Sequence, residues 1–148
     1  MQDAFGGVLS IVLIALFLVI VEGVLGFTVN YTKAFKMKNI VISAIEEYED
    51  ATCVDATKPN TQCRKKILNG AKSIGYSPSK ISCPSGVGWT NIDSLFCVKV
   101  IPSHNKNKVY KIVTQVDVNI PIIRNIMGLS FFQVSGDTRI VQKQSGSG

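Results

Sequence analysis

The chain has 148 residues, enough for one domain with a modest core. Its net charge of +6 does not indicate nucleic-acid binding, because the basic residues are spread over several segments and no nucleic-acid-binding motif accompanies them. Enzymes of the common motif classes are also excluded, since the chain has a single histidine, His104, and no nucleotide-binding, metalloprotease or serine-hydrolase motif. We therefore expect no catalytic residue, no cofactor and no metal site.

The first 29 residues contain the apolar run LSIVLIALFLVIVEGVLGF, and Asp3 and Glu22 are their only charged side chains. As a helix, Val8 to Val29 would span roughly 33 Å, close to the thickness of a bilayer's hydrocarbon core. A cleaved signal peptide is the alternative. However, this run is longer than a usual signal core, no basic residue precedes it and no A-x-A-like site follows. Residues 1–29 are therefore predicted to be a transmembrane and assembly helix.

The helical pattern continues beyond the apolar run without a proline. Apolar side chains recur at steps of three and four, which predicts an amphipathic continuation over residues 30–50 and one helix from about residue 7 to 50. The predicted apolar stripe consists of Phe27, Tyr31, Ala34, Met37, Val41, Ala44 and Tyr48.

Residues 51–142 are predicted to form an α+β globular domain. A second helix is expected in the stretch 61–78, with one apolar face and Gly75 as its C-terminal stop. The segment 77–91 is rich in Ser, Pro and Gly and is predicted to be loop. Apolar or alternating stretches at 94–101, 109–120 and 129–142 predict three strands, with a bulge or bend at Gly136-Asp137. Residues 143–148 are predicted to be a flexible tail.

These elements predict an α+β fold in which the long helix packs on a small three-stranded antiparallel sheet. Four cysteines follow the apolar run without C-x-x-C spacing, which favours disulfides in an oxidising compartment over zinc. Three pairings are open, and we favour the local pairs Cys53–Cys63 and Cys83–Cys97. The alternative is four unpaired thiols in a cytosolic domain.

The charges that flank the apolar run predict the opposite orientation from the cysteines. Lys33, Lys36 and Lys38 follow the run and nothing basic precedes it, so the positive-inside rule places the domain in the cytoplasm. A basic leader removed before Met1 would resolve the conflict in favour of an extracellular domain.

Two stretches resemble the type IV pilin-like superfamily, and most of all the TadE-like pseudopilins. One is LVIVEGVLGF with the following KAFKMKNIVISAIEEY; the other is VDVNIPIIRNIMGLSFFQVSGDTRIV. The resemblance implies a structural subunit of an extracellular pilus-like filament or envelope assembly, which polymerises through its N-terminal helix. Its partners would be copies of itself or related pilin-like subunits, and the membrane. It would be a single-pass membrane protein before assembly and a cell-surface protein afterwards. Where such proteins usually carry an early glutamate, this chain has Gly6 and Gly7.

Seven residues are candidates for assembly. Glu22 is expected either to pair with a basic group on another subunit or to reach the membrane edge as the span ends early. The small residues would let helices approach closely, and the stalk lysines would set their register. The candidates are Glu22, Gly6, Gly7, Gly23, Gly26, Lys33 and Lys36. The alternative function is a monomeric, membrane-anchored extracellular binding module that recognises a ligand through the loops around Trp89 and His104.

Overall fold

The computed structural model describes residues 2–49, 51–103, 107–118, 120, 124–125 and 128–141. The chain begins with helix α1 (Gln2–Tyr48), followed by the short helix η1 (Ala51–Val54) and helix α2 (Gln62–Ser73). Four strands follow: β1 (Trp89–Ile92), β2 (Phe96–Pro102), β3 (Lys108–Asp117) and β4 (Phe131–Asp137). They form one antiparallel sheet in the order β1-β2-β3-β4. The α+β prediction is confirmed.

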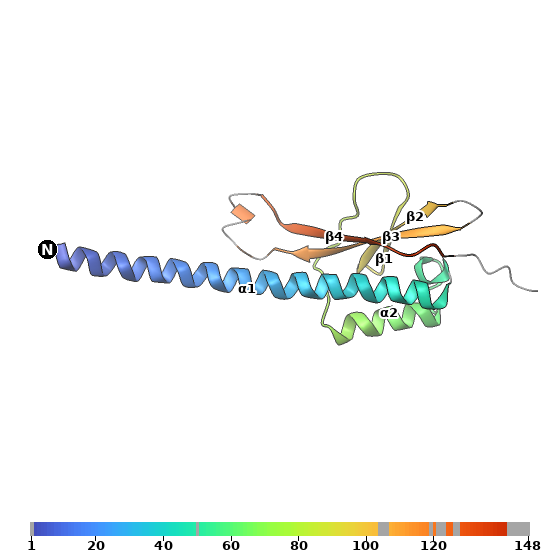
Figure 1. Ribbon diagram of the computed structural model, residues 1–148, viewed down its shortest axis with the longest axis horizontal. Helices are drawn as coiled ribbons and strands as arrows, with labels where there is room; N and C mark the ends of the chain where they lie inside the picture. Colours follow the sequence, from blue (N-terminus) through green and yellow to red (C-terminus); the bar gives the residue numbers. More distant parts are fainter. Residues whose placement is uncertain are drawn as a thin grey trace, which may run out of the picture.

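Helix α1 runs unbroken for 47 residues, so the prediction of one long helix is confirmed, with its start a few residues earlier than expected. It ends before Glu49, whose φ of 44° is left-handed and cannot continue the helix. The C-terminal half of α1 lies between the sheet and α2, whereas the N-terminal half extends beyond both (Figure 1).

The core lies between α1, the sheet and α2. Ala34, Met37, Val41 and Ala44 of the predicted stripe are buried, together with Ile45, which the stripe did not include. Phe27 contacts Phe132 of β4 edge to face, with ring centroids 5.6 Å apart. Tyr31 and Tyr48 are instead 44% and 40% exposed, because they lie at the margins of the packed face. The prediction of a helix that packs one stripe against the sheet therefore holds for the centre of that stripe.

The prediction of three strands is wrong, because β1 forms within the segment predicted to be loop. Strand β1 pairs with β2 from Trp89↔Lys99 to Ile92↔Phe96. The turn between them has positive φ at both central residues, 51° at Asp93 and 56° at Ser94, and the N–H of Leu95 donates to the carbonyl of Ile92 at 2.9 Å. Such turns usually contain glycine or Asn-Gly. The Asp-Ser sequence gives no such signal, so the hairpin was not predicted.

The alternating pattern at 109–120 is typical of a strand that is buried on one face, but the middle of β3 is buried on both faces. The segment 77–88, here called the covering loop, passes over the face of the sheet opposite α1 (Figure 1). Ile81 and Cys83 in this loop pack against Val113 of β3. Beside them the side-chain oxygen of Gln115 accepts a 3.0 Å hydrogen bond from the N–H of Ser82. The sequence of this loop has no periodic hydrophobic pattern, so it did not indicate that the loop covers the second face of the sheet.

The bulge predicted at Gly136-Asp137 is absent from the described strand. Strand β4 pairs continuously with β3 from Lys111↔Asp137 to Asp117↔Phe131. Gly136 has a different role: a Cβ at this position would lie 2.8 Å from Lys38 and 3.1 Å from Ile42 of α1. Glycine therefore permits close packing of β4 on α1. His104 and the tail at 143–148 lie outside the described residues.

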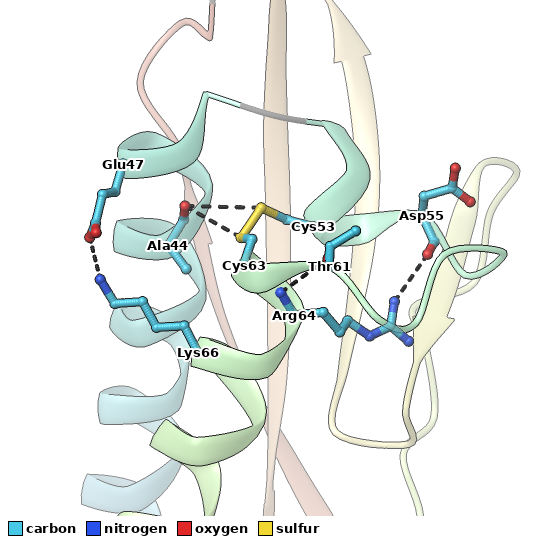
Figure 2. Close-up of a disulfide and its surroundings, with 8 residues drawn as sticks. All are labelled: Ala44, Glu47, Cys53, Asp55, Thr61, Cys63, Arg64 and Lys66. Carbon is cyan, nitrogen blue, oxygen red and sulfur yellow. Dashed lines mark hydrogen bonds and ion pairs between the residues drawn. A yellow bond between two sulfur atoms is a disulfide. The ribbon is translucent and has the colours of Figure 1, made fainter.

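A junction of polar and disulfide contacts holds α2 against the end of α1 (Figure 2). The Cys53–Cys63 disulfide joins η1 to α2, and its sulfurs lie 4.0 and 3.5 Å from the carbonyl oxygen of Ala44. At the start of α2, the hydroxyl of Thr61 caps the helix by accepting from the N–H of Arg64 at 3.2 Å. As predicted, α2 ends just before Gly75, which has a φ of 61°.

Arg64 is 3% exposed and ties α2 to the β1–β2 turn. Its guanidinium donates to both carboxylate oxygens of Asp93, at 2.5 and 2.6 Å, and to the carbonyl of Asp55 at 3.1 Å. Lys66, two positions further along α2, pairs with Glu47 at the surface. The two pairs differ because the Arg64 guanidinium is buried while the Asp93 side chain is 30% exposed, whereas both partners of the Lys66–Glu47 pair are exposed and screened by solvent.

We therefore expect Arg64→Met to lower the free energy of unfolding by about 2 kcal/mol, because the hydrogen bonds from the buried guanidinium to the Asp93 carboxylate and the Asp55 carbonyl are lost. Lys66→Met on the same helix is the matched control and should change little. Urea unfolding of the full chain in detergent micelles, followed by circular dichroism, measures both. Equal effects of the two substitutions would contradict this account of the junction.

Tyr76 follows α2 and anchors the start of the covering loop to β3. Its hydroxyl donates to the carbonyl of Gln115 and accepts from the N–H of the same residue, both at 3.0 Å. Burial raises the pKa of Tyr76 to about 12, against a lowering by the Gln115 backbone. At Asp117, burial alone would raise the pKa, but hydrogen bonds from Ser79 and Gln115 lower it below its usual value.

The raised pKa of Tyr76 predicts loss of stability in alkali. Between the ordinary tyrosine pKa of 10.0 and about 12 the unfolded chain releases this proton while the folded chain keeps it. Stability is therefore full below pH 10 and falls as pH rises, by at most about 1.4 kcal/mol per pH unit from this group. In urea unfolding from pH 8 to 11.5, Tyr76→Phe should lack this component, so its deficit relative to wild type should shrink with pH. A constant difference would contradict the prediction.

Candidate functional site

The N-terminal half of α1 presents apolar side chains to its surroundings on every face. An 18-residue window of this helix has a mean hydropathy of 3.0, and none of it is buried against the rest of the described chain. Exposure is 64% at Val8, 64% at Phe17 and 60% at Leu25. This half of α1 is therefore long and apolar enough to cross a membrane, judged by length and composition alone.

The four candidate glycines of this helix are not equivalent. A Cβ at Gly6, Gly7 or Gly26 would meet nothing within 4 Å. One at Gly23 would lie 3.3 Å from the side chain of Ile120, in the segment that follows β3. Gly23 therefore packs against Ile120 of its own chain, whereas Gly6, Gly7 and Gly26 leave room for another helix.

Glu22 lies one position before Gly23 but is exposed. Within the described residues its carboxylate forms no hydrogen bond or ion pair, since the ion pairs there join Arg64 to Asp93 and Lys66 to Glu47. Lys33 and Lys36, which follow on the same helix, take part in neither pair. The three charged candidates for assembly are thus unneutralised within the described part of the chain.

Lys33 and Lys36 lie in a hollow that sequence reasoning missed. It has a volume of 380 Å³ and forms where the C-terminal end of α2 meets α1. Its walls are Thr28, Val29, Thr32, Lys33 and Lys36 on α1 and Ser73 and Ile74 at the end of α2. No local sequence signal predicts where α2 ends beside α1, because the disulfide junction at the other end of α2 fixes that position.

Both predicted disulfide pairs are confirmed: Cys53–Cys63, with a Cα–Cα distance of 5.2 Å, and Cys83–Cys97, with 5.5 Å. They hold different layers. The first secures α2, which forms one wall of the hollow, and the second ties the covering loop to β2. Cys53 and Cys63 are 0% and 2% exposed, whereas Cys83 is half-buried.

This difference in exposure predicts the order of reduction. With a mild thiol reductant under native conditions, Cys83–Cys97 should open first, because a reductant can reach Cys83 without unfolding the core. Alkylation of the freed thiols and peptide mass spectrometry would identify them, and denatured protein, in which both bonds open, serves as the control. Earlier or simultaneous opening of Cys53–Cys63 would contradict the prediction.

Comparison of the chain with protein families, curated proteins and solved structures found no match. Its function is therefore inferred from the geometry and chemistry described above.

Proposed function

We propose that this protein is a structural subunit of a pilus-like filament or envelope assembly, in which the N-terminal half of α1 packs against the same segment of other copies. The observation that carries the proposal is the exposed apolar half of α1. None of its apolar 18-residue window is buried against the described chain. Before assembly, a bilayer covers this surface, with the chain crossing the membrane once. In the assembly, neighbouring helices replace the lipid.

Two further features support an assembly of helices at the cell surface. Gly6, Gly7 and Gly26 have open space around them, and small residues on apolar helices allow close approach of a second backbone. The two disulfides support an oxidising location for the domain, outside the cytoplasm. This orientation is the opposite of the one that the positive-inside rule predicts from Lys33, Lys36 and Lys38.

The structure gives less support to the alternative, a monomeric anchored binding module. Trp89, the aromatic residue around which such a site was predicted, is half-buried and packs against the cluster of Ile81, Cys97 and Val113. A ligand-binding tryptophan would be expected to lie open beside a groove.

Electron microscopy of material sheared from cells that produce the protein, with an antibody against the folded domain, tests the proposal. We expect labelled filaments whose subunit mass is lower than that of the reduced chain by four hydrogens. Phe17→Ala should reduce filament yield strongly, because a fully buried phenylalanine contributes about 1.5–3 kcal/mol at every subunit contact. The substitution keeps the helix apolar, so the variant should still insert into the membrane.

Val87→Ala is the matched control, since Val87 lies in the covering loop and is 93% exposed. It should leave filament yield unchanged. Protein found only as monomers in the membrane fraction, with no filaments, would sink the proposal in favour of the anchored binding module.

A further inference from the structure

The inference concerns how neighbouring copies are arranged, and it rests on the proposed function. Lys33 and Lys36 lie 11 and 14 positions after Glu22 on the same unbroken helix. At 3.6 residues per turn, each lysine lies within about 40° of Glu22 around the helix axis. Along the axis, however, they are roughly 16 and 21 Å away, so Glu22 cannot reach either lysine of its own chain.

The hollow and the segment around Glu22 are complementary in charge and in polarity. The hollow is lined by two lysines that form no described ion pair and by the apolar residues Val29 and Ile74. The segment around Glu22 offers one carboxylate with Leu18 and Leu25 one turn away on the same side, 55% and 60% exposed. An apolar helix that carries a single acid therefore fits a partly apolar recess that carries two bases.

We propose that the hollow between α1 and the end of α2 receives Glu22 and its flanking leucines from a second copy, with the carboxylate paired to Lys33 and Lys36. A buried or lipid-facing carboxylate is costly unless it is paired, and this pairing neutralises groups that the single chain leaves unpaired.

The proposal fixes the relation between the two copies. Because Glu22 and the lysines lie on the same side of α1, two parallel helices bring them together when one is rotated by about half a turn. The second copy is also shifted along the axis by roughly 16–21 Å. This shift places the domain of one copy beside the apolar half-helix of the other, so the domain covers part of the exposed surface.

Thiol crosslinking between two chains tests this arrangement. Cells would co-produce one chain with Glu22→Cys and a second with Lys36→Cys, and in a parallel experiment Lys33→Cys. We expect a covalent dimer when sheared filaments are treated with a short bifunctional thiol crosslinker, because an ion pair between two long side chains holds their Cβ atoms further apart than the about 4 Å that a direct disulfide requires. Whichever lysine position reacts more readily distinguishes a shift near 16 Å from one near 21 Å.

The matched control pairs Glu22→Cys with Phe35→Cys. Phe35 is exposed at the same level of the helix as Lys36 but lies about 100° around the axis. It should trap little or no dimer. Equal trapping at Phe35 and Lys36 would overturn the proposed face of the contact.

A charge exchange tests the pairing itself. Glu22→Lys should lower filament yield by about tenfold or more, the factor that 1.4 kcal/mol represents. Combining it with Lys33→Glu and Lys36→Glu in the same chain should restore filaments, which a purely structural role for these residues would not produce. Normal filaments from Glu22→Gln and from the Lys33→Gln/Lys36→Gln variant would overturn the proposal.

Failure of this inference is distinguishable from failure of the proposed function. Filaments that form but never trap Glu22 against either lysine position would overturn the contact and leave the filament intact. No filaments from any variant, including wild type, would overturn both. If trapping fails and Lys33→Gln/Lys36→Gln instead weakens binding of the protein to vesicles of anionic phospholipid, the hollow binds lipid headgroups and the proposal is wrong.

Discussion

The continuity of α1 is the constraint on which the other features of this structure depend. A single helix of 47 residues packs between α2 and the sheet along one half and presents apolar side chains on every face along the other. With no break between the halves, the position of the domain on the helix fixes the direction in which the apolar half points. The offset between Glu22 and the lysines is therefore a property of one rigid element rather than of a flexible linker.

The remaining elements hold that helix by adding a layer on each side. The sheet alone has four short strands, and a sheet of this size needs a covered face to be stable. Helix α1 covers one face and the covering loop covers the other, where Cys83–Cys97 fastens it. Helix α2 lies on the far side of α1, where Cys53–Cys63 joins it to η1 and the Arg64–Asp93 pair ties it to the β1–β2 turn. The covering loop and α2 thus each carry a disulfide. These disulfides compensate for the limited hydrophobic core of a small domain.

Features that depend on local periodicity were predictable from the sequence. The uninterrupted apolar and amphipathic repeat predicted α1, alternation predicted β3 and β4, and Gly75 predicted the end of α2. Local spacing also favoured the observed disulfide pairs. The features that were missed depend on contacts between distant segments: Asp93 is held in a left-handed turn where Arg64 reaches it, and Gln115 is buried only because residues 80–82 pass over it. The hollow at Lys33 and Lys36 belongs to the same class, because α2 reaches it from 40 positions further along the chain.

The proposed pairing gives Glu22 a role in the direction of assembly as well as in its geometry. In a bilayer, a carboxylate at this depth raises the free energy of the unassembled subunit by several kcal/mol unless water or a partner reaches it. In the proposed assembly, the same group would meet two cations at the edge of a folded domain. Transfer from lipid to the filament would therefore remove the free-energy cost of an unpaired carboxylate, a cost that an all-apolar helix does not have. It would do so only in the register that places Glu22 at the hollow. An all-apolar helix would associate through burial alone, which is non-directional and tolerates many registers, whereas one acid on this helix makes a single register the favourable one.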